Sequence, residues 1–130
     1  MEMHRHTFRK AERLCSKKHI ETLFAGGSRT ISAYPLRVVF MPVEEAKEPV
    51  QVLISVSKRH FKHAVDRNRI KRLIREAYRL NKQLLIEALG AQKLKLAFVW
   101  MSDDLADYTT IASKMKTLLE RIGENLQQNE

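Results

Sequence analysis

The sequence predicts a small two-layer fold, of the α/β sandwich or α+β type, in which helices pack against one small sheet. Three short segments rich in β-branched and aromatic residues alternate as strands do. Two longer segments repeat their apolar residues at helical spacing, and a shorter helical segment precedes the strands. The order helix, strands, helix, strand, helix favours helices on a sheet. The 130 residues fit one domain, 1–130, with flexible ends expected at about 1–14 and 124–130.

The first helix and two strands are expected in the N-terminal half. Ser16 is expected to cap a short helix, KKHIETLFA, that stops at Gly26 and Gly27. The segment YPLRVVFMPV lies between prolines and is predicted as a strand, and VQVLISVS is predicted as a second strand. Residues expected on one face of these strands are Leu36, Val38 and Phe40, then Val50, Val52, Ile54 and Val56.

A long helix, a third strand and a last helix follow. The long helix is expected to have Asp66 as its N-cap and to run to Leu89, with Gly90 beyond its end. The segment LKLAFVWM is predicted as a strand, and an amphipathic helix is predicted after the turn DDLADYTT. The apolar residues of these two elements are Leu94, Leu96, Phe98 and Trp100, then Ile111, Met115, Leu118, Leu119 and Ile122.

Positive charge is concentrated around the long helix. The net charge is +9, and residues 58–82 hold 10 Lys and Arg against 2 acids, or +8, whereas residues 83–130 hold 5 against 7, or −2. Such a block repels itself unless an anion binds, so nucleic acid is the favoured partner and an anionic membrane surface the second. The chain has no apolar run of 18 residues, no recognisable signal peptide and a single cysteine, Cys15. A cytoplasmic protein without membrane association is predicted.

Helical geometry separates this charge from the apolar residues of the segment AVDRNRIKRLIREAYR. At about 100° per residue, five cations lie within about 60° of Asn68. They are Lys71, Arg72, Arg75, Arg79 and Lys82, and the opposite side has Ile70, Leu73, Ile74, Ala77 and Asn81, continued by Leu84. Arg67 and Arg69 flank the cations where the free N–H groups of the helix also favour anions. This row predicts contact with a phosphate backbone.

Other interpretations of the charged residues stay open. The basic side could be an ordinary solvated face, although Glu76 is the one acid able to pair with it. Asp103, Asp104 and Asp107 form a dense acidic cluster that could bind Mg²⁺ in a stand-alone nuclease, but capping of the last helix is the simpler explanation. We find no Gly-rich phosphate loop, zinc-ligand spacing or nucleophile elbow. The residues therefore predict a binding module with no catalytic or metal site of its own.

The segment RNRIKRLIREAYR resembles the bacterial ribonuclease P protein subunits. That family is marked by a strand ending V-S-K and, after a short loop, by A-V-x-R-N-x-x-K-R-x-x-R. The matching residues are Val56, Ser57, Lys58, Ala64, Val65, Arg67, Asn68, Lys71, Arg72 and Arg75. The resemblance extends in order from about Phe8 to Ile122.

The resemblance implies a fold similar to the second domain of ribosomal protein S5, with a left-handed βαβ crossover around the basic helix. It also implies a tRNA 5′-maturation endoribonuclease whose catalytic component is an RNA, with Mg²⁺ at the RNA active site and the protein inactive alone. The expected partners are the catalytic RNA and precursor tRNA, without an obligate protein partner. A ribosome-associated protein of the same fold, which binds rRNA, is the alternative.

The same resemblance implies the site residues. Those expected to face RNA are Lys58, Arg59, Arg67, Asn68, Arg69, Lys71, Arg72, Arg75 and Arg79. A cleft for the 5′ leader of precursor tRNA is expected at Ile20, Phe24, Leu36 and Val38. Two features depart from the family pattern. The loop KRHFKH is one residue longer than usual and lacks glycine, and Ile20 stands where an aromatic residue is usual, which weakens base stacking.

Overall fold

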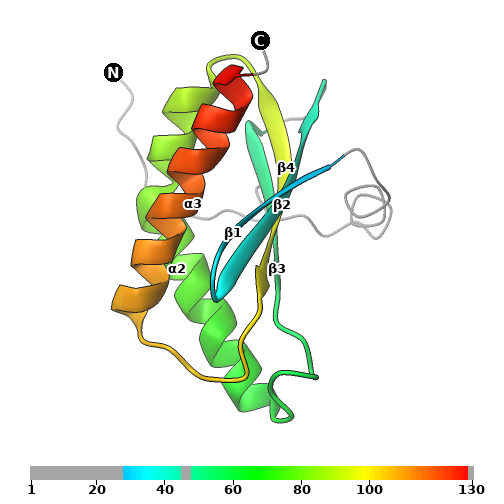
Figure 1. Cartoon of the computed structure of the whole chain (residues 1–130), viewed down its shortest axis with the longest axis vertical. Helices are drawn as coiled ribbons and strands as arrows, with labels where there is room; N and C mark the ends of the chain where they lie inside the picture. Colours follow the sequence, from blue (N-terminus) through cyan, green and yellow to red (C-terminus); the bar gives the residue numbers. More distant parts are fainter. Residues whose placement is uncertain (1–27, 45–47, 129–130) are drawn as a thin grey trace.

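The described part of the chain folds into a four-stranded sheet with two helices on one face. A computed structural model describes residues 28–44 and 48–128. The strands are β1 (Arg29–Ala33), β2 (Leu36–Val43), β3 (Val50–Ser55) and β4 (Lys93–Trp100), and the helices are α2 (Ala64–Leu89) and α3 (Tyr108–Gln128). Figure 1 shows α2 and α3 side by side on the same side of the sheet. This arrangement confirms the predicted two-layer α+β fold.

The sheet is mixed, and its spatial order is β1-β2-β4-β3. β2 pairs antiparallel with both β1 and β4, which places Leu36 opposite Trp100. β3 pairs in parallel with β4, which places Val50 opposite Leu94. Because parallel neighbours need a crossover connection, α2 links the two strands as the helix of a βαβ unit. The resemblance to the ribonuclease P protein subunits implies a βαβ unit around the basic helix, and the parallel pairing of β3 with β4 agrees with it.

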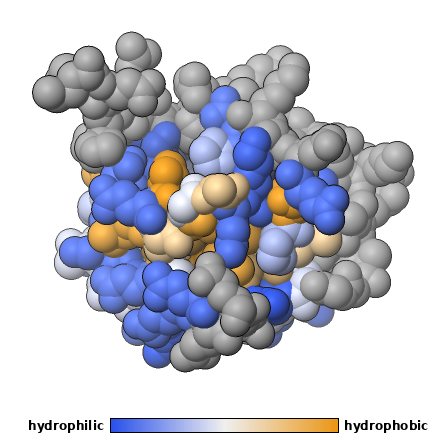
Figure 2. Space-filling view, turned by 90° about the horizontal axis from the view of Figure 1, so that it is seen from above, coloured by the Kyte–Doolittle hydropathy of each residue, from blue (hydrophilic) through white to orange (hydrophobic). Residues whose placement is uncertain are grey.

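The core lies between the sheet and the two helices. The strand residues that fill it are at most 2% exposed: Leu36, Val38, Phe40, Val50, Val52, Leu94, Leu96, Phe98 and Trp100. From α3 come Ile111, Met115, Leu118, Leu119 and Ile122, each 0% exposed as the helical spacing predicts. Tyr78 of α2 packs on Phe98 of β4, with ring centroids 5.8 Å apart and planes tilted by 52°. Figure 2 views the molecule from above relative to Figure 1, and it shows hydrophobic residues in the middle of this surface with hydrophilic residues around them.

The two helices approach each other closely where they end. Gly123 of α3 is buried, and a Cβ added there would lie 3.0 Å from the Cβ of Ala88 on α2. Gly90 has a φ of 60° and ends α2 after Leu89, as predicted. No helix among the described residues combines the length and the hydropathy needed to cross a membrane.

Two helix ends differ from their predicted positions. α2 begins at Ala64 with His63 as its N-cap, so the predicted cap Asp66 lies in the first turn instead. Its carboxylate still suits the positive end of the helix dipole. α3 continues to Gln128 and buries Leu126, which follows the buried Ile122 by one turn. The expected flexible end from residue 124 is therefore helical up to residue 128.

The strand β1 has no counterpart among the predicted elements. Its sequence, RTISA, is short and largely polar, and it becomes a strand through its pairing with β2. Pairing of this kind depends on the tertiary neighbour more than on intrinsic propensity. The predicted helix before β1 lies outside the described residues.

The buried side of α2 is turned from the predicted one. Lys82, which the helical wheel groups with the cations, is buried at 6% exposed, whereas Leu84, predicted on the apolar side, is 41% exposed. The buried residues of the helix are Ile70, Ile74, Ala77, Tyr78, Lys82, Leu85 and Leu89. α2 packs against both the sheet and α3, so these two neighbours determine which of its residues are buried. The row of surface cations therefore ends at Arg79.

Candidate nucleic-acid interface

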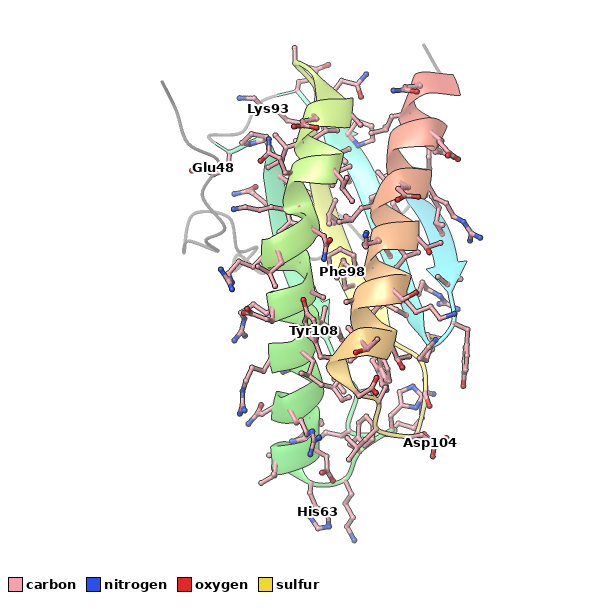
Figure 3. The ribbon with its side chains drawn as sticks, turned by 90° about the vertical axis from the view of Figure 1, so that its left-hand side faces the viewer. Glu48, His63, Lys93, Phe98, Asp104 and Tyr108 are labelled. Atoms are coloured by element: carbon pink, nitrogen blue, oxygen red, sulfur yellow. The ribbon has the colours of Figure 1, made fainter. Side chains whose placement is uncertain are left out.

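The exposed side of α2 carries most of the residues predicted to bind RNA. Six of them form a strip that we name the basic face: Asn68, Arg69, Lys71, Arg72, Arg75 and Arg79. Four of the six are exposed, whereas Lys71 and Arg79 are partly buried. In Figure 3, nitrogen-tipped side chains project from α2 on the side away from α3. The structure thus brings these predicted residues together on one accessible surface.

Arg79 is paired with an acidic neighbour on the same helix. Its Nε donates a hydrogen bond to Glu76 Oε2 at 3.1 Å, and its Nη2 donates to Glu76 Oε1. These hydrogen bonds lower the pKa of Glu76 and raise the pKa of Arg79. Both side chains remain partly exposed, so water screens the pair. Arg79 therefore presents less uncompensated charge than Arg72 or Arg75.

Arg67 also has intramolecular partners. Its Nη1 donates to the backbone carbonyl of Phe61 at 2.9 Å and to that of Lys62 at 3.0 Å. Phe61 is buried in the core at 6% exposed. The guanidinium therefore joins α2 to the loop that precedes it. Any contact of Arg67 with RNA must coexist with this bridging role.

The loop of residues 58–63 has a defined hydrogen-bonded conformation. The N–H groups of His60 and Phe61 donate to the carbonyl of Ser57 at 3.1 and 3.3 Å. The N–H of Arg59 donates to Ser57 Oγ at 3.0 Å. No described residue other than glycine has a positive φ, so this loop does not require the glycine that the family usually has. The exposed residues of the loop are Lys58, Arg59, Lys62 and His63.

The acidic cluster near α3 makes contacts that explain two of its three members. His60 Nδ1 donates to Asp103 Oδ1 at 2.7 Å. Asp107 Oδ1 accepts a hydrogen bond from the N–H of Thr110 at 2.9 Å, which lowers the pKa of Asp107 and caps α3. Within residues 28–44 and 48–128, no three His, Cys, Asp or Glu side chains come together as metal ligands. The described residues thus give no support to the stand-alone nuclease.

Two residues predicted for the leader cleft lie in the core. Leu36 and Val38 are 0% exposed and belong to the cluster packed between sheet and helices, so neither offers surface to an RNA. Strand alternation divides β2 into two faces, but it does not say which face the helices cover. The alternate position Arg37 belongs to the opposite face of the sheet. Ile20 and Phe24 lie outside the described residues.

The contact between His60 and Asp103 is the feature that sequence reasoning missed. The two residues are 43 positions apart and come from different loops. Neither belongs to a motif, and no spacing rule joins them. The turn at Ser57 and the parallel pairing of β3 with β4 bring the two loops to the same end of the sheet.

Solved structures of ribonuclease P proteins share this fold. The RNase P protein of Staphylococcus aureus matches with a TM-score of 0.71 at 21% identity, covering 87% of this chain and 96% of that chain. The RNase P protein from Thermotoga maritima matches with a TM-score of 0.69 at 21% identity, covering 85% and 96%. At this identity the likeness shows the common fold.

Fold and surface together define a basic α+β protein suited to binding a polyanion. The sequence profile of the Ribonuclease P family matches residues 8–123. The ribonuclease P protein component of Porphyromonas gingivalis is 42% identical over 120 residues, covering 90% of this chain and 87% of that protein. That of Chlorobaculum tepidum is 36% identical over 120 residues, covering 84% and 78%. The chain belongs to the ribonuclease P protein family, the protein components of an endoribonuclease that matures the 5′ end of tRNA.

Proposed function

We propose that this chain binds the catalytic RNA of ribonuclease P through the basic face of α2. The observation that carries the proposal is the exposure of Arg69, Arg72 and Arg75 beside Asn68 on one side of a helix. Cations at this spacing match a phosphate backbone, and guanidinium groups can bind phosphate oxygens with two parallel hydrogen bonds. Lys58 and Arg59 extend the surface beyond the start of the helix. The family match favours this partner over rRNA in a ribosome-associated protein.

In this proposal the protein supplies charge and position, and the RNA supplies the chemistry. Mg²⁺ belongs to the RNA active site. Among the described residues, no three His, Cys, Asp or Glu side chains come together as metal ligands, and Asp103 and Asp107 already accept hydrogen bonds from His60 and Thr110. Cations on the protein would lower the repulsion between the catalytic RNA and precursor tRNA. The compartment we propose is the cytoplasm.

We further propose that the 5′ leader lies against the face of the sheet opposite α2 and α3. Arg37 of β2 and Lys95 of β4 belong to that face, since their alternate neighbours are in the core. Among the described residues, Arg37 Nε is buried without a hydrogen-bond partner. Both side chains could neutralise leader phosphates. This placement replaces the one at Leu36 and Val38.

Salt dependence of binding to the catalytic RNA tests the basic face. With about five phosphate contacts, log affinity should fall against log salt with a slope of about −4, at about 0.7–0.9 per contact. Arg72→Ala and Arg75→Ala should each weaken binding and flatten the slope by about one contact. Lys116→Ala, which removes an exposed cation from α3, is the matched control and should leave both unchanged. A wild-type slope near zero would contradict the proposal.

Cleavage assays test the division of labour. Precursor tRNA should be cleaved with Mg²⁺ and the catalytic RNA, and the protein alone should cleave none. Replacing Asp103, Asp104 and Asp107 together by Asn should preserve the cleavage rate at saturating protein. Loss of the cleavage step with intact assembly would instead favour a metal site on the protein.

A further inference from the structure

The loop of residues 58–63 is held to the fold at three points. Phe61 is buried in the core, and its carbonyl accepts from Arg67 of α2. His60 is joined to Asp103, which lies between β4 and α3. A six-residue loop held both from α2 and from the connection between β4 and α3 has little conformational freedom left to lose on binding.

The contact with Asp103 crosses between the two loops at this end of the molecule. Figure 3 shows that His63, at the start of α2, and Asp104, in the connection to α3, lie at the same end. A carboxylate can only accept, so His60 Nδ1 carries the hydrogen of the 2.7 Å contact. The His60 side chain is 16% exposed, whereas that of Asp103 is 79% exposed. The imidazole is thus packed in place, and the carboxylate holds it from the solvent side.

We propose that Asp103 is a positioning residue for RNA binding, which acts through His60 to hold the basic loop in its binding conformation. The cations that the loop presents are Lys58, Arg59 and Lys62, with His63 beside them. The inference rests on the proposed function, because it assumes that these cations meet the catalytic RNA. It assigns to an acidic residue a favourable role in binding a polyanion.

Simple electrostatics predicts the opposite effect of Asp103 on the affinity for RNA. A negative charge near a phosphate-binding surface repels the RNA, so its removal should tighten binding. Asp104 follows Asp103 directly, is exposed, and its carboxylate makes no hydrogen bond or ion pair with the described residues. The two residues therefore offer the same charge change in nearly the same place, with and without the contact to the loop.

The experiment compares Asp103→Ala with Asp104→Ala in binding to the catalytic RNA. Asp103→Ala should weaken binding by about two- to fivefold, the size expected for one exposed pair, although it removes a negative charge. Asp104→Ala should bind as tightly as the wild type or more tightly. Asp103→Asn keeps an oxygen acceptor for His60 Nδ1–H and should restore binding. The melting temperatures of all three should lie close to that of the wild type, because exposed pairs contribute little to stability.

A variant that lacks the loop cations tests whether Asp103 acts by positioning them. In a variant with Lys58→Ala, Arg59→Ala and Lys62→Ala, the loop cations are gone, so adding Asp103→Ala should cause no further loss. Equal tightening by Asp103→Ala and Asp104→Ala, or no effect of Asp103→Ala, would overturn the inference. Arg72→Ala and Arg75→Ala report separately on the proposed function. If they weaken binding while Asp103→Ala does not, the positioning role alone fails.

Discussion

Single arginines on α2 differ in what their guanidinium groups already bind. Arg72 and Arg75 are exposed, whereas Arg67 donates to two loop carbonyls and Arg79 pairs with Glu76. The sequence identifies all four as cations near one side of a helix, and the structure agrees. The sequence alone cannot show which of these arginines form hydrogen bonds with other groups of the protein. We therefore expect substitutions at the four positions to act through different mechanisms.

Glu76→Gln should strengthen binding to the catalytic RNA. The change removes the carboxylate partner of Arg79 and a negative charge beside the basic face. We expect an affinity gain of about two- to fivefold at low salt and a steeper salt dependence by about one contact. Glu87→Gln, an exposed acid further along the same helix, is the control for net charge. Equal gains in affinity from both substitutions would show that pairing with Glu76 does not reduce the contribution of Arg79 to RNA binding.

The same pair gives the free protein a small pH dependence. The folded-state pKa of Glu76 is lowered, so the stabilisation is present above the ordinary carboxyl value of 4.5 and is lost as the pH falls through the lowered pKa. The melting temperature of Glu76→Gln should accordingly lie below that of the wild type at neutral pH and converge with it in acid. A constant difference across this range would contradict the assignment.

At the scale of elements, the sequence predicts what periodicity can encode. β4, which the sequence predicts as the third strand, and α3 follow their apolar spacing. Leu96 and Phe98 of β4 and Ile111 and Met115 of α3 are all buried. β1 is missed because pairing with β2 makes it a strand. Burial of the ammonium-bearing Lys82 is also missed, because its long aliphatic stem can be covered by neighbouring elements that a helical wheel does not contain.

The close approach of α2 and α3 predicts a sensitive position at Gly123. A methyl group there would meet the Cβ of Ala88 at 3.0 Å, whereas carbon atoms favour about 3.5–4.0 Å. Gly123→Ala gains about 1 kcal/mol of helix propensity but loses about 1–3 kcal/mol to overpacking. We expect a net loss of about 1 kcal/mol in the free energy of unfolding, measured in urea.

The double variant Gly123→Ala/Ala88→Gly tests the cause of that loss. It moves the methyl group from one helix to the other and should be more stable than the sum of the single changes predicts. Additive losses would show that the two residues do not interact across the interface.

At the scale of the whole molecule, the fold and the site depend on different information. The layers follow from apolar spacing, and the family motif predicts the basic helix in its correct place. The face of the sheet at Leu36 and Val38 and the link from His60 to Asp103 depend on how the layers are stacked. In Figure 3, nitrogen-tipped side chains project from α2 on the side away from α3, and the basic face itself consists of five cations and Asn68, with no acid.

That uneven charge should make the free protein more stable in salt. The net charge is +9, and residues 58–82 alone contribute +8. The Debye length falls from about 10 Å at 0.1 M salt to about 3 Å at 1 M, which screens repulsion between neighbouring cations of α2. We expect the melting temperature of the free protein to rise with NaCl. A variant with Arg72→Gln and Arg75→Gln should have a higher melting temperature at low salt and a smaller rise.

A matched pair of variants separates the effect of where the charge lies from the effect of the total net charge on the salt response. Lys114→Gln and Lys116→Gln together remove the same two charges from α3, where acids and cations are mixed. If repulsion is concentrated on α2, this second variant should keep the salt response of the wild type, because its removed cations have few like neighbours. Identical responses of the two variants would mean that the free protein responds to its net charge. In that case, the basic face would have no local electrostatic repulsion for a bound RNA to relieve.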